Sequence, residues 1–326
     1  MSVCVTGGTG FLGGALVRRL LSERVAVRVF ARPSTRADEI EARGAEVVRG
    51  ELSDSDAVNR AVRGTELVYH VAAKVDSGGT ASDFFETNVS GTERVLAACL
   101  EAGVRRVVYE SSIAVYGLVK NGERIDEKTP YEEFPKLRDF YSQSKLAADQ
   151  SAISFARKTG LPLAIMRPGI IYGPGKGLPL GLLSFNLGKS NFVFGNPGLH
   201  FPLNYVKNLI DAMQLAANLK GDELREFNIV DDENLTLLRY HNTKSSVDHT
   251  HTRFFPGWPV LTAAPVVDTV MRALPLGGTR LSKHQLKRSL QDRFYDTRRI
   301  RQELGWAPRV SLEESIRRSL GKPDHA

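Results

Sequence analysis

The chain of 326 residues predicts an α/β fold in which a doubly wound parallel sheet carries a smaller, discontinuous C-terminal lobe. Two observations lead to this fold class. Short runs rich in β-branched residues alternate with longer segments of helical periodicity, which is typical of a parallel sheet covered by helices on both faces. A glycine-rich turn also follows the first of these runs directly.

Seven short apolar runs are expected to form the strands, because each is bounded by charged or turn-forming residues. They cover residues 2–6, 25–30, 46–49, 67–72, 104–111, 162–167 and 227–230. Apolar residues at spacings of three and four predict helices over residues 82–102, 141–158 and 206–219. Gly103 follows the first of these helices and suits its C-terminal cap.

The regular alternation ends after Arg167, where the sequence becomes rich in Gly and Pro up to Gly198. The sheet domain is therefore expected over residues 1–167 and 201–232. The smaller lobe is expected over residues 168–200 and 233–326, where apolar residues are irregularly spaced, as in a variable cap over a pocket.

Composition limits the classes of partner. The formal net charge is +7, from 44 Lys and Arg against 37 Asp and Glu, which favours anionic ligands. The basic residues are scattered without aromatic interleaving, so a small-molecule substrate is expected and nucleic acid is not. Cys4 and Cys99 lie inside apolar patterns, as reduced thiols do. With no leader peptide and no run of roughly 18 apolar residues, a cytoplasmic protein without an integral membrane segment is expected.

The first expected strand runs directly into Gly7-Gly-Thr-Gly-Phe-Leu-Gly13, and a helix begins near Phe11. In a dinucleotide-binding Rossmann turn, the first glycine permits the tight turn, the second lets the backbone approach a pyrophosphate, and the third allows close helix packing. The helix N-terminus then faces the diphosphate. The expected contacts from this turn are Gly7, Thr9, Gly10, Phe11, Leu12 and Gly13.

The end of the second strand indicates which dinucleotide is bound. An NAD site usually carries an acidic residue there for the ribose 2′-hydroxyl, whereas this chain has Arg32. An arginine can pair with a 2′-phosphate, so NADP(H) is favoured and NAD(H) remains possible. The other contacts expected around the dinucleotide are Glu51, Leu52, Val71, Ala72 and Ala73.

The residue pair Tyr141 and Lys145 lies one helical turn apart, so the phenol and the ammonium share a face. A tyrosine is a poor base at neutral pH, but an adjacent cation favours the phenolate and is expected to move its pKa toward the working range. Ser112 follows the fifth strand, at the sheet edge where doubly wound folds bind ligands, and can donate to a substrate oxygen.

Taken together, these residues resemble the extended short-chain dehydrogenase/reductase family over essentially the whole chain. Further matching segments include Asn88-Val-Ser-Gly-Thr92, Arg167-Pro-Gly-Ile-Ile-Tyr-Gly-Pro174 and Leu304-Gly-Trp-Ala-Pro308. The resemblance implies that Tyr141 is the acid/base, that Lys145 binds the ribose and tunes it, and that Ser112 donates to the carbonyl oxygen. It also implies a homodimer, and cofactor contacts from Tyr141, Lys145, Asn88, Ser111, Pro168, Gly169 and Ile171.

Local departures favour one branch of this family. Dehydratases place Asp-Glu after the catalytic hydroxyl, where this chain has Ile113-Ala114. The anion clamp of sugar-nucleotide members is replaced at Gly169-Ile170 and Phe201, although other arginines can substitute. The remaining motifs resemble the 3β-hydroxysteroid dehydrogenase-like branch, which includes 2-alkyl-3-oxoalkanoate reductases. An apolar pocket would then be lined by Leu178, Leu180, Leu182, Leu183, Phe185, Phe192, Phe194 and Phe201.

The hypothesis is therefore reversible hydride transfer between nicotinamide and a steroid- or β-keto-lipid-like ketone. A nucleotide-sugar 4-epimerase with tightly bound NAD is the alternative, and a non-enzymatic dinucleotide sensor is disfavoured because Tyr141, Lys145 and Ser112 are all retained.

Two further patterns are given no catalytic role. His241, His249 and His251 are expected in an exposed polar loop, and no metal is predicted because no further ligands lie at zinc spacing. Residues 254–275 are expected to form a helix that closes the pocket, with contact to a membrane surface as the alternative.

Overall fold

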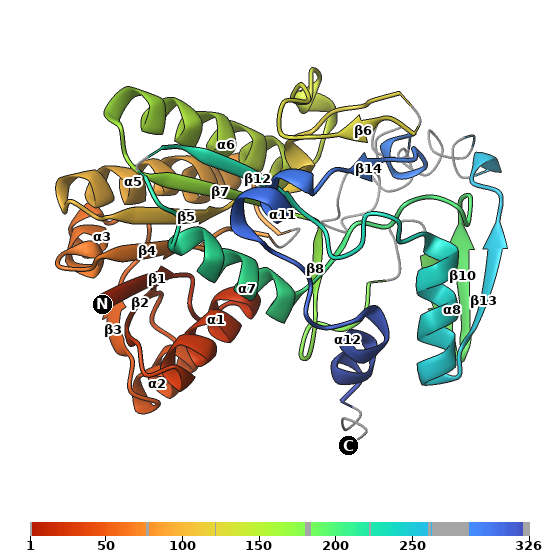
Figure 1. The fold of residues 1–326 in the computed structure, drawn as a ribbon, viewed down its shortest axis with the longest axis horizontal. Helices are drawn as coiled ribbons and strands as arrows, with labels where there is room; N and C mark the ends of the chain where they lie inside the picture. The colour runs from red at the N-terminus through yellow and green to blue at the C-terminus, as the bar shows by residue number, and fades with distance from the viewer. Residues whose placement is uncertain are drawn as a thin grey trace.

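A seven-stranded parallel sheet forms the centre of the molecule, in the order β12-β7-β5-β4-β1-β2-β3 (Figure 1). The computed structural model describes residues 2–75, 78–120, 122–179, 184–221, 223–259, 262 and 287–321. In chain order the strands are β1 (Ser2–Thr6), β2 (Ala26–Ala31), β3 (Glu46–Arg49), β4 (Leu67–His70), β5 (Arg106–Glu110), β7 (Leu163–Pro168) and β12 (Arg225–Ile229). All seven predicted strands are present, with ends that differ by at most two residues, and the doubly wound fold is confirmed.

Helices cover both faces of this sheet (Figure 1). One face carries α1 (Phe11–Ser22), α2 (Thr35–Ala42) and α7 (Val206–Ala217), and the other carries α3 (Ser55–Val62), α5 (Gly91–Glu101) and α6 (Phe140–Thr159). Successive side chains of a strand point to opposite faces of the sheet. Val3 and Val5 of β1 therefore belong to the buried cluster on the first face, and Cys4 belongs to the cluster on the second face. Cys4 and Cys99 are buried free thiols.

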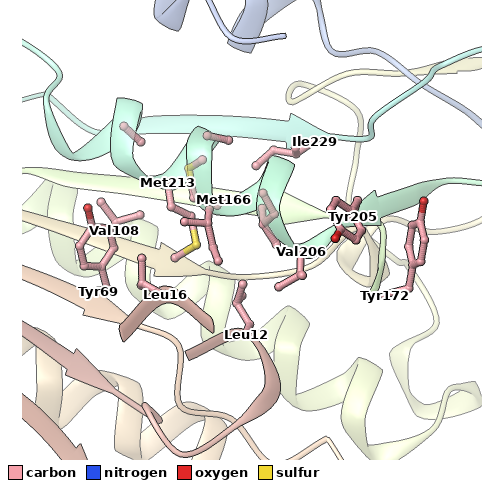
Figure 2. Close-up of a cluster of buried hydrophobic side chains, with 14 of the residues drawn as sticks. Leu12, Leu16, Tyr69, Val108, Met166, Tyr172, Tyr205, Val206, Met213 and Ile229 are labelled. Carbon is pink, nitrogen blue, oxygen red and sulfur yellow. The ribbon is translucent and has the colours of Figure 1, made fainter. Parts of the chain in front are cut away.

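The core beneath the glycine turn fixes the start of α1. Leu12 and Leu16 of α1 pack in one buried cluster with Met166 of β7 and Met213 of α7 (Figure 2). Each fully buried side chain of this size contributes about 1.5–3 kcal/mol. The N-terminus of α1 is therefore held rigidly against the sheet edge.

The helix predicted over residues 82–102 is interrupted by a π-helical turn. It consists of α4 (Ala81–Phe85), the π turn η1 (Glu86–Ser90) and α5. Single π turns inside helices are frequent at functional sites. Here the turn carries Asn88, whose side chain is buried.

Among the described residues, three small sheets accompany the main sheet. They are β13-β10-β9, β11-β8 and β14-β6, built from β6 (Arg124–Ile125), β8 (Ile170–Tyr172), β9 (Ser184–Leu187), β10 (Ser190–Phe194), β11 (Leu203–Tyr205), β13 (His251–Phe255) and β14 (Phe294–Tyr295). The described part of the chain also contains η2 (Ile113–Val115), η3 (Pro135–Leu137), α8 (Leu237–Asp248), α11 (Arg298–Leu304) and α12 (Leu312–Ser319).

The pocket-closing helix expected over residues 254–275 falls mostly outside the described residues. Its first two residues, Phe254 and Phe255, belong to β13 instead. Within the described part of the chain, no helix is both long and apolar enough to cross a membrane.

Candidate active site

Four neighbouring strands deliver the predicted site residues to one edge of the sheet. β1 leads into Gly7, β4 into Val71, β5 into Ser111 and Ser112, and β7 into Gly169. Carboxyl ends of parallel strands meet at the same edge, which is where open α/β sheets bind ligands. Two cavities lie along this edge, one over the glycine turn and one over Tyr141.

The glycine turn has the geometry its sequence requires. Gly7 has φ +71°, and a Cβ there would lie 2.7 Å from the Cα of Ala72. A Cβ on Gly13 would lie 2.2 Å from the carbonyl oxygen of Gly7, so the helix packs against the turn closely enough to require glycine. Gly10 is the N-cap of α1 and has no side-chain cap, which leaves the helix N-terminus available for an anion.

The first cavity, of about 570 Å³, lies over this turn. Exposed Arg32 follows β2 and lines it. The other predicted cofactor residues in its lining are Gly7, Thr9, Gly10, Glu51, Leu52, Val71, Ala72 and Ala73. The structure therefore brings together, from the ends of separate strands, the residues expected around the adenosine and diphosphate.

The second cavity, of about 540 Å³, contains the reactive residues. Ser112 and Tyr141 line it together with Pro168, Gly169 and Ile171. Gly169 is required by close packing, because a Cβ there would lie 2.4 Å from the carbonyl oxygen of Pro202. A volume of this size is typical of small-molecule sites.

The lining of this cavity is less apolar than expected. Of the predicted apolar set, Phe194 and Phe201 line it, whereas Phe185 is half-exposed and stacks on Phe192 within the small sheet. Leu178 packs against the main core. Leu180, Leu182 and Leu183 lie outside the described residues.

Tyr141 and Lys145 share the first turns of α6, whose N-terminus is capped by Asp139. Burial raises the pKa of Tyr141 to about 12, while Lys145 and the Ser112 hydroxyl lower it and Glu110 raises it. Lys145 therefore acts on this pKa in the expected direction, but the net pKa of Tyr141 lies above its ordinary value and not closer to neutrality. Desolvation outweighs the lysine.

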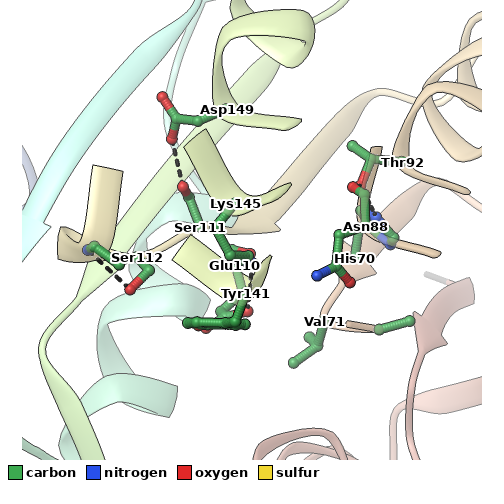
Figure 3. A network of polar contacts seen from close by, with 12 residues as sticks. His70, Val71, Asn88, Thr92, Glu110, Ser111, Ser112, Tyr141, Lys145 and Asp149 are labelled. Carbon is green, nitrogen blue, oxygen red and sulfur yellow. Dashed lines mark hydrogen bonds and ion pairs between the residues drawn. The ribbon is translucent and has the colours of Figure 1, made fainter. Parts of the chain in front are cut away.

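Glu110, which the sequence analysis did not select, explains part of this result. It is the last residue of β5 and lines the same cavity as Tyr141. Lys145 Nζ donates to the Glu110 carbonyl oxygen at 2.6 Å and lies 3.2 Å from Glu110 Oε2 (Figure 3). The available signal was a charged residue at the carboxyl end of a buried strand, directly before Ser111 and Ser112.

Asn88 joins the strand edge to α6. Its Oδ1 accepts from Lys74 N at 2.7 Å, and its Nδ2 donates to Lys74 O at 3.1 Å and to Ser144 Oγ at 2.9 Å. The residue lines neither cavity. It therefore fixes the loop after β4 against the helix that carries Tyr141.

His70 lies in the same buried network (Figure 3). Its Nδ1 is 2.8 Å from Thr6 Oγ1, and its Nε2 is 2.9 Å from Thr92 Oγ1. Burial first, and then the charge of Lys145, lower the pKa of His70 to about 3. The imidazole is therefore neutral at all ordinary pH values and ties β1 to α5.

Ser111 points away from both cavities. Its hydroxyl donates to Asp149 (Figure 3), and Asp149 also pairs with buried Arg167 at 2.6 Å. Among the other predicted residues outside the cavity linings, Leu12 is in the core and Lys145 is held by Glu110. Neither Ser111 nor Leu12 is part of a cavity lining, and a cofactor contact from either residue stays a prediction.

Three arginines at the second cavity were also missed. Arg138, Arg288 and Arg293 line it, and they come from segments up to 155 positions apart in the sequence. No local spacing links Arg138 to Arg288 and Arg293. Only folding brings them to the same cavity.

The histidine-rich segment differs from its expected structure. His241 is buried in α8, not in an exposed loop, whereas His249 and His251 are exposed. Among the described residues, no group of three or more His, Cys, Asp or Glu side chains is arranged to hold a metal ion.

The family model of the NAD-dependent epimerase/dehydratase family matches residues 3–230. The chain belongs to this family. It is therefore an enzyme of the extended short-chain dehydrogenase/reductase type, an oxidoreductase from an NAD(P)-dependent family. The predicted resemblance is confirmed.

Individual relatives extend over nearly the whole chain. A putative dihydroflavonol 4-reductase of Synechocystis is 32% identical, covering 96% of this chain and 91% of the relative. A 2-alkyl-3-oxoalkanoate reductase of Shewanella oneidensis is 28% identical, and the match covers 96% of this chain and 84% of the relative. The crystal structure of gox2253 superposes with a TM-score of 0.81 at 26% identity, and the match covers 98% of this chain and 97% of that chain. MoeE5 in complex with UDP-glucose and NAD, at 21% identity and TM-score 0.73 with 98% of each chain covered, shares the fold.

Proposed function

We propose that this family member interconverts a secondary alcohol and a ketone on a largely apolar substrate, using Ser112, Tyr141 and Lys145. The observation that carries the proposal is that Ser112 and Tyr141 line one cavity at the sheet edge, with Lys145 one helical turn from the tyrosine. The names of the Synechocystis and Shewanella relatives, both reductases, support the same reaction class.

The cavity over the glycine turn fits a dinucleotide. Gly7 and Gly13 leave no room for a Cβ, and α1 begins without a side-chain cap. Gly7, Gly10 and the α1 N-terminus would hold the diphosphate, and Arg32 would face a 2′-phosphate, so NADP(H) is favoured over NAD(H). When bound, the nicotinamide supplies or accepts the hydride.

The chain's own residues handle the proton and the oxygen. Tyr141 gives a proton to the carbonyl oxygen during reduction and removes it from the alcohol during oxidation. Ser112 donates to the same oxygen and orients it. Lys145 places a positive charge beside the phenol, which favours the phenolate form needed for oxidation.

The substrate body is proposed to lie against the apolar part of the second cavity. Its members are Ile113, Ile170, Ile171, Val193, Phe194, Leu199, Phe201 and Leu237. These side chains suit the chain or ring system of a β-keto lipid or a steroid.

A nucleotide-sugar 4-epimerase remains the second candidate because one observation favours it, namely the arginines of the same cavity. In that reaction one hydroxyl is oxidised and then reduced again, so the cofactor shows no net change. A ketone panel followed by reduced-nicotinamide absorbance tests both. NADPH consumption with an apolar ketone supports the reductase, whereas unchanged absorbance with epimerisation of a UDP-sugar supports the alternative.

A further inference from the structure

The substrate cavity has a cationic side that the proposed reaction does not explain. Arg138 precedes α6, and Arg288 and Arg293 lie in the segment that leads into β14. All three line the cavity that also contains Ser112 and Tyr141. A purely apolar ketone offers these guanidinium groups nothing to bind.

Arg138 is held in place by the protein. Its Nη1 lies 3.2 Å from Glu132 Oε2 and its Nη2 donates to Ser142 Oγ at 2.8 Å, and the side chain is almost fully buried. Its Nε is nevertheless buried without an acceptor in the described part of the chain.

Arg288 and Arg293 are less well satisfied. Arg288 Nη2 makes long contacts with the carbonyl oxygens of Ile113, at 3.4 Å, and Tyr116, at 3.2 Å. Among the described residues, the buried Nε of Arg288 and the buried Nε and Nη1 of Arg293 have no acceptor. A buried donor without an acceptor is destabilising, and more so when it carries charge.

Among the residues that the structure describes, the charges of the cluster are also unbalanced. Burial, followed by the like charges of Arg293 and Arg138, holds the pKa of Arg288 well below its usual range. The nearby carboxylates have other partners: Glu132 pairs with Arg138, Glu110 with Lys145, Asp139 caps α6 and Asp292 pairs with His200. An anion supplied by a bound ligand would balance the charge of Arg288 and Arg293.

We infer that Arg288 and Arg293, with Arg138 behind them, bind an anionic group of the substrate, a carboxylate or a phosphate, while the apolar side of the cavity holds its body. The inference deepens the proposed function and rests on it for the position of the reacting carbonyl. It makes the substrate amphiphilic, unlike a neutral steroid. A free β-keto acid and a nucleotide-linked compound both supply such an anion.

Calorimetric titration separates these two sources without requiring turnover. The protein is first saturated with NADPH, so that the anion site of the glycine turn is filled. Decanoate, its neutral counterpart decanol, and UDP are then titrated. Decanoate is expected to bind at least tenfold more tightly than decanol if the anion is a carboxylate on an apolar chain, and UDP is expected to bind instead if it is a nucleotide diphosphate.

The variants Arg288→Gln and Arg293→Gln are each expected to raise the Kd for the anion by about tenfold to a hundredfold, the usual effect of losing a charge-assisted hydrogen bond. Arg288→Lys, which keeps the charge, should recover part of the loss and shows that the cavity still folds. Arg43→Gln, at an exposed position after α2, is the matched control and should change nothing.

Two outcomes distinguish the inference from the proposed reaction. If Arg288→Gln and Arg293→Gln bind both decanoate and UDP as tightly as the wild type does, the proposed anion site is wrong, whatever the turnover. If Tyr141→Phe retains Arg288-dependent anion binding and the wild type shows no ketone reduction, the site stands and the proposed reaction fails.

Discussion

Lys145 Nζ contacts both the backbone carbonyl oxygen and the carboxylate of Glu110, at 2.6 Å and 3.2 Å, and Glu110 lines the cavity that contains Tyr141. The lysine proposed to favour the tyrosinate is therefore partly neutralised by a carboxylate from the end of β5. The ionisation of Tyr141 depends on both charges, because one lowers its pKa and the other raises it.

Glu110→Gln is predicted to shift the pH dependence of alcohol oxidation. Removing the carboxylate removes a charge that raises the pKa of Tyr141, so the phenolate should form at lower pH. The pH at which kcat/KM reaches half its maximum should fall by roughly one unit. Glu110→Asp keeps the charge and is the control. An unchanged midpoint in Glu110→Gln would show that Glu110 does not act on Tyr141.

Arg32→Ser is predicted to change cofactor preference. Arg32 lines the first cavity and is exposed, so its contact with a 2′-phosphate is screened by solvent. We expect the Kd for NADPH to rise about tenfold and the Kd for NADH to stay constant. Arg36→Ser, at another exposed arginine that does not line the cavity, should affect neither. Equal weakening of both cofactors by Arg32→Ser would contradict the proposed 2′-phosphate contact.

His70 is predicted to make the fold sensitive to mild acid. Its pKa is about 3 in the folded chain against an ordinary value of 6.5, so below pH 6.5 the unfolded chain binds a proton that the folded chain does not. Stability contributed by the neutral imidazole is present above pH 6.5 and is lost as the pH falls toward 3. At pH 5.5 the loss is about 1.4 kcal/mol.

Urea unfolding at pH 7.5 and pH 5.5 measures this loss of folding stability. The wild type should lose about 1.4 kcal/mol more than His70→Gln over this interval, because glutamine does not titrate. A variant whose stability falls with pH as steeply as that of the wild type would show that other groups cause the acid sensitivity.

The sequence predicted the parts of the fold and site that depend on local patterns. Seven strands followed from alternating apolar runs, and Gly7 and Gly13 followed from a motif whose steric reasons hold in the structure. Strand order then brought Ser112 to the cavity of Tyr141, because parallel strands end at one edge.

The features that were missed depend on contacts between distant segments. Desolvation and Glu110 raise the pKa of Tyr141 against the effect of Lys145, and the spacing of Tyr141 and Lys145 reveals neither of these two causes. His241 was placed in a loop because its surroundings are polar in sequence, yet it lies buried in α8. Arg138 and Arg288 come together only through folding.

The most direct test of the central claim is the anaerobic consumption of NADPH by the wild type and by Tyr141→Phe, with apolar ketones and 3-oxo acids as substrates. We predict that the wild type oxidises NADPH with at least one of them. Tyr141→Phe should reduce kcat by about 10²–10⁴-fold, the usual contribution of a general acid, while the Kd for NADPH stays nearly unchanged. Equal turnover by both proteins, or equal loss of turnover and of NADPH affinity, would contradict the assignment of Tyr141 as the acid/base.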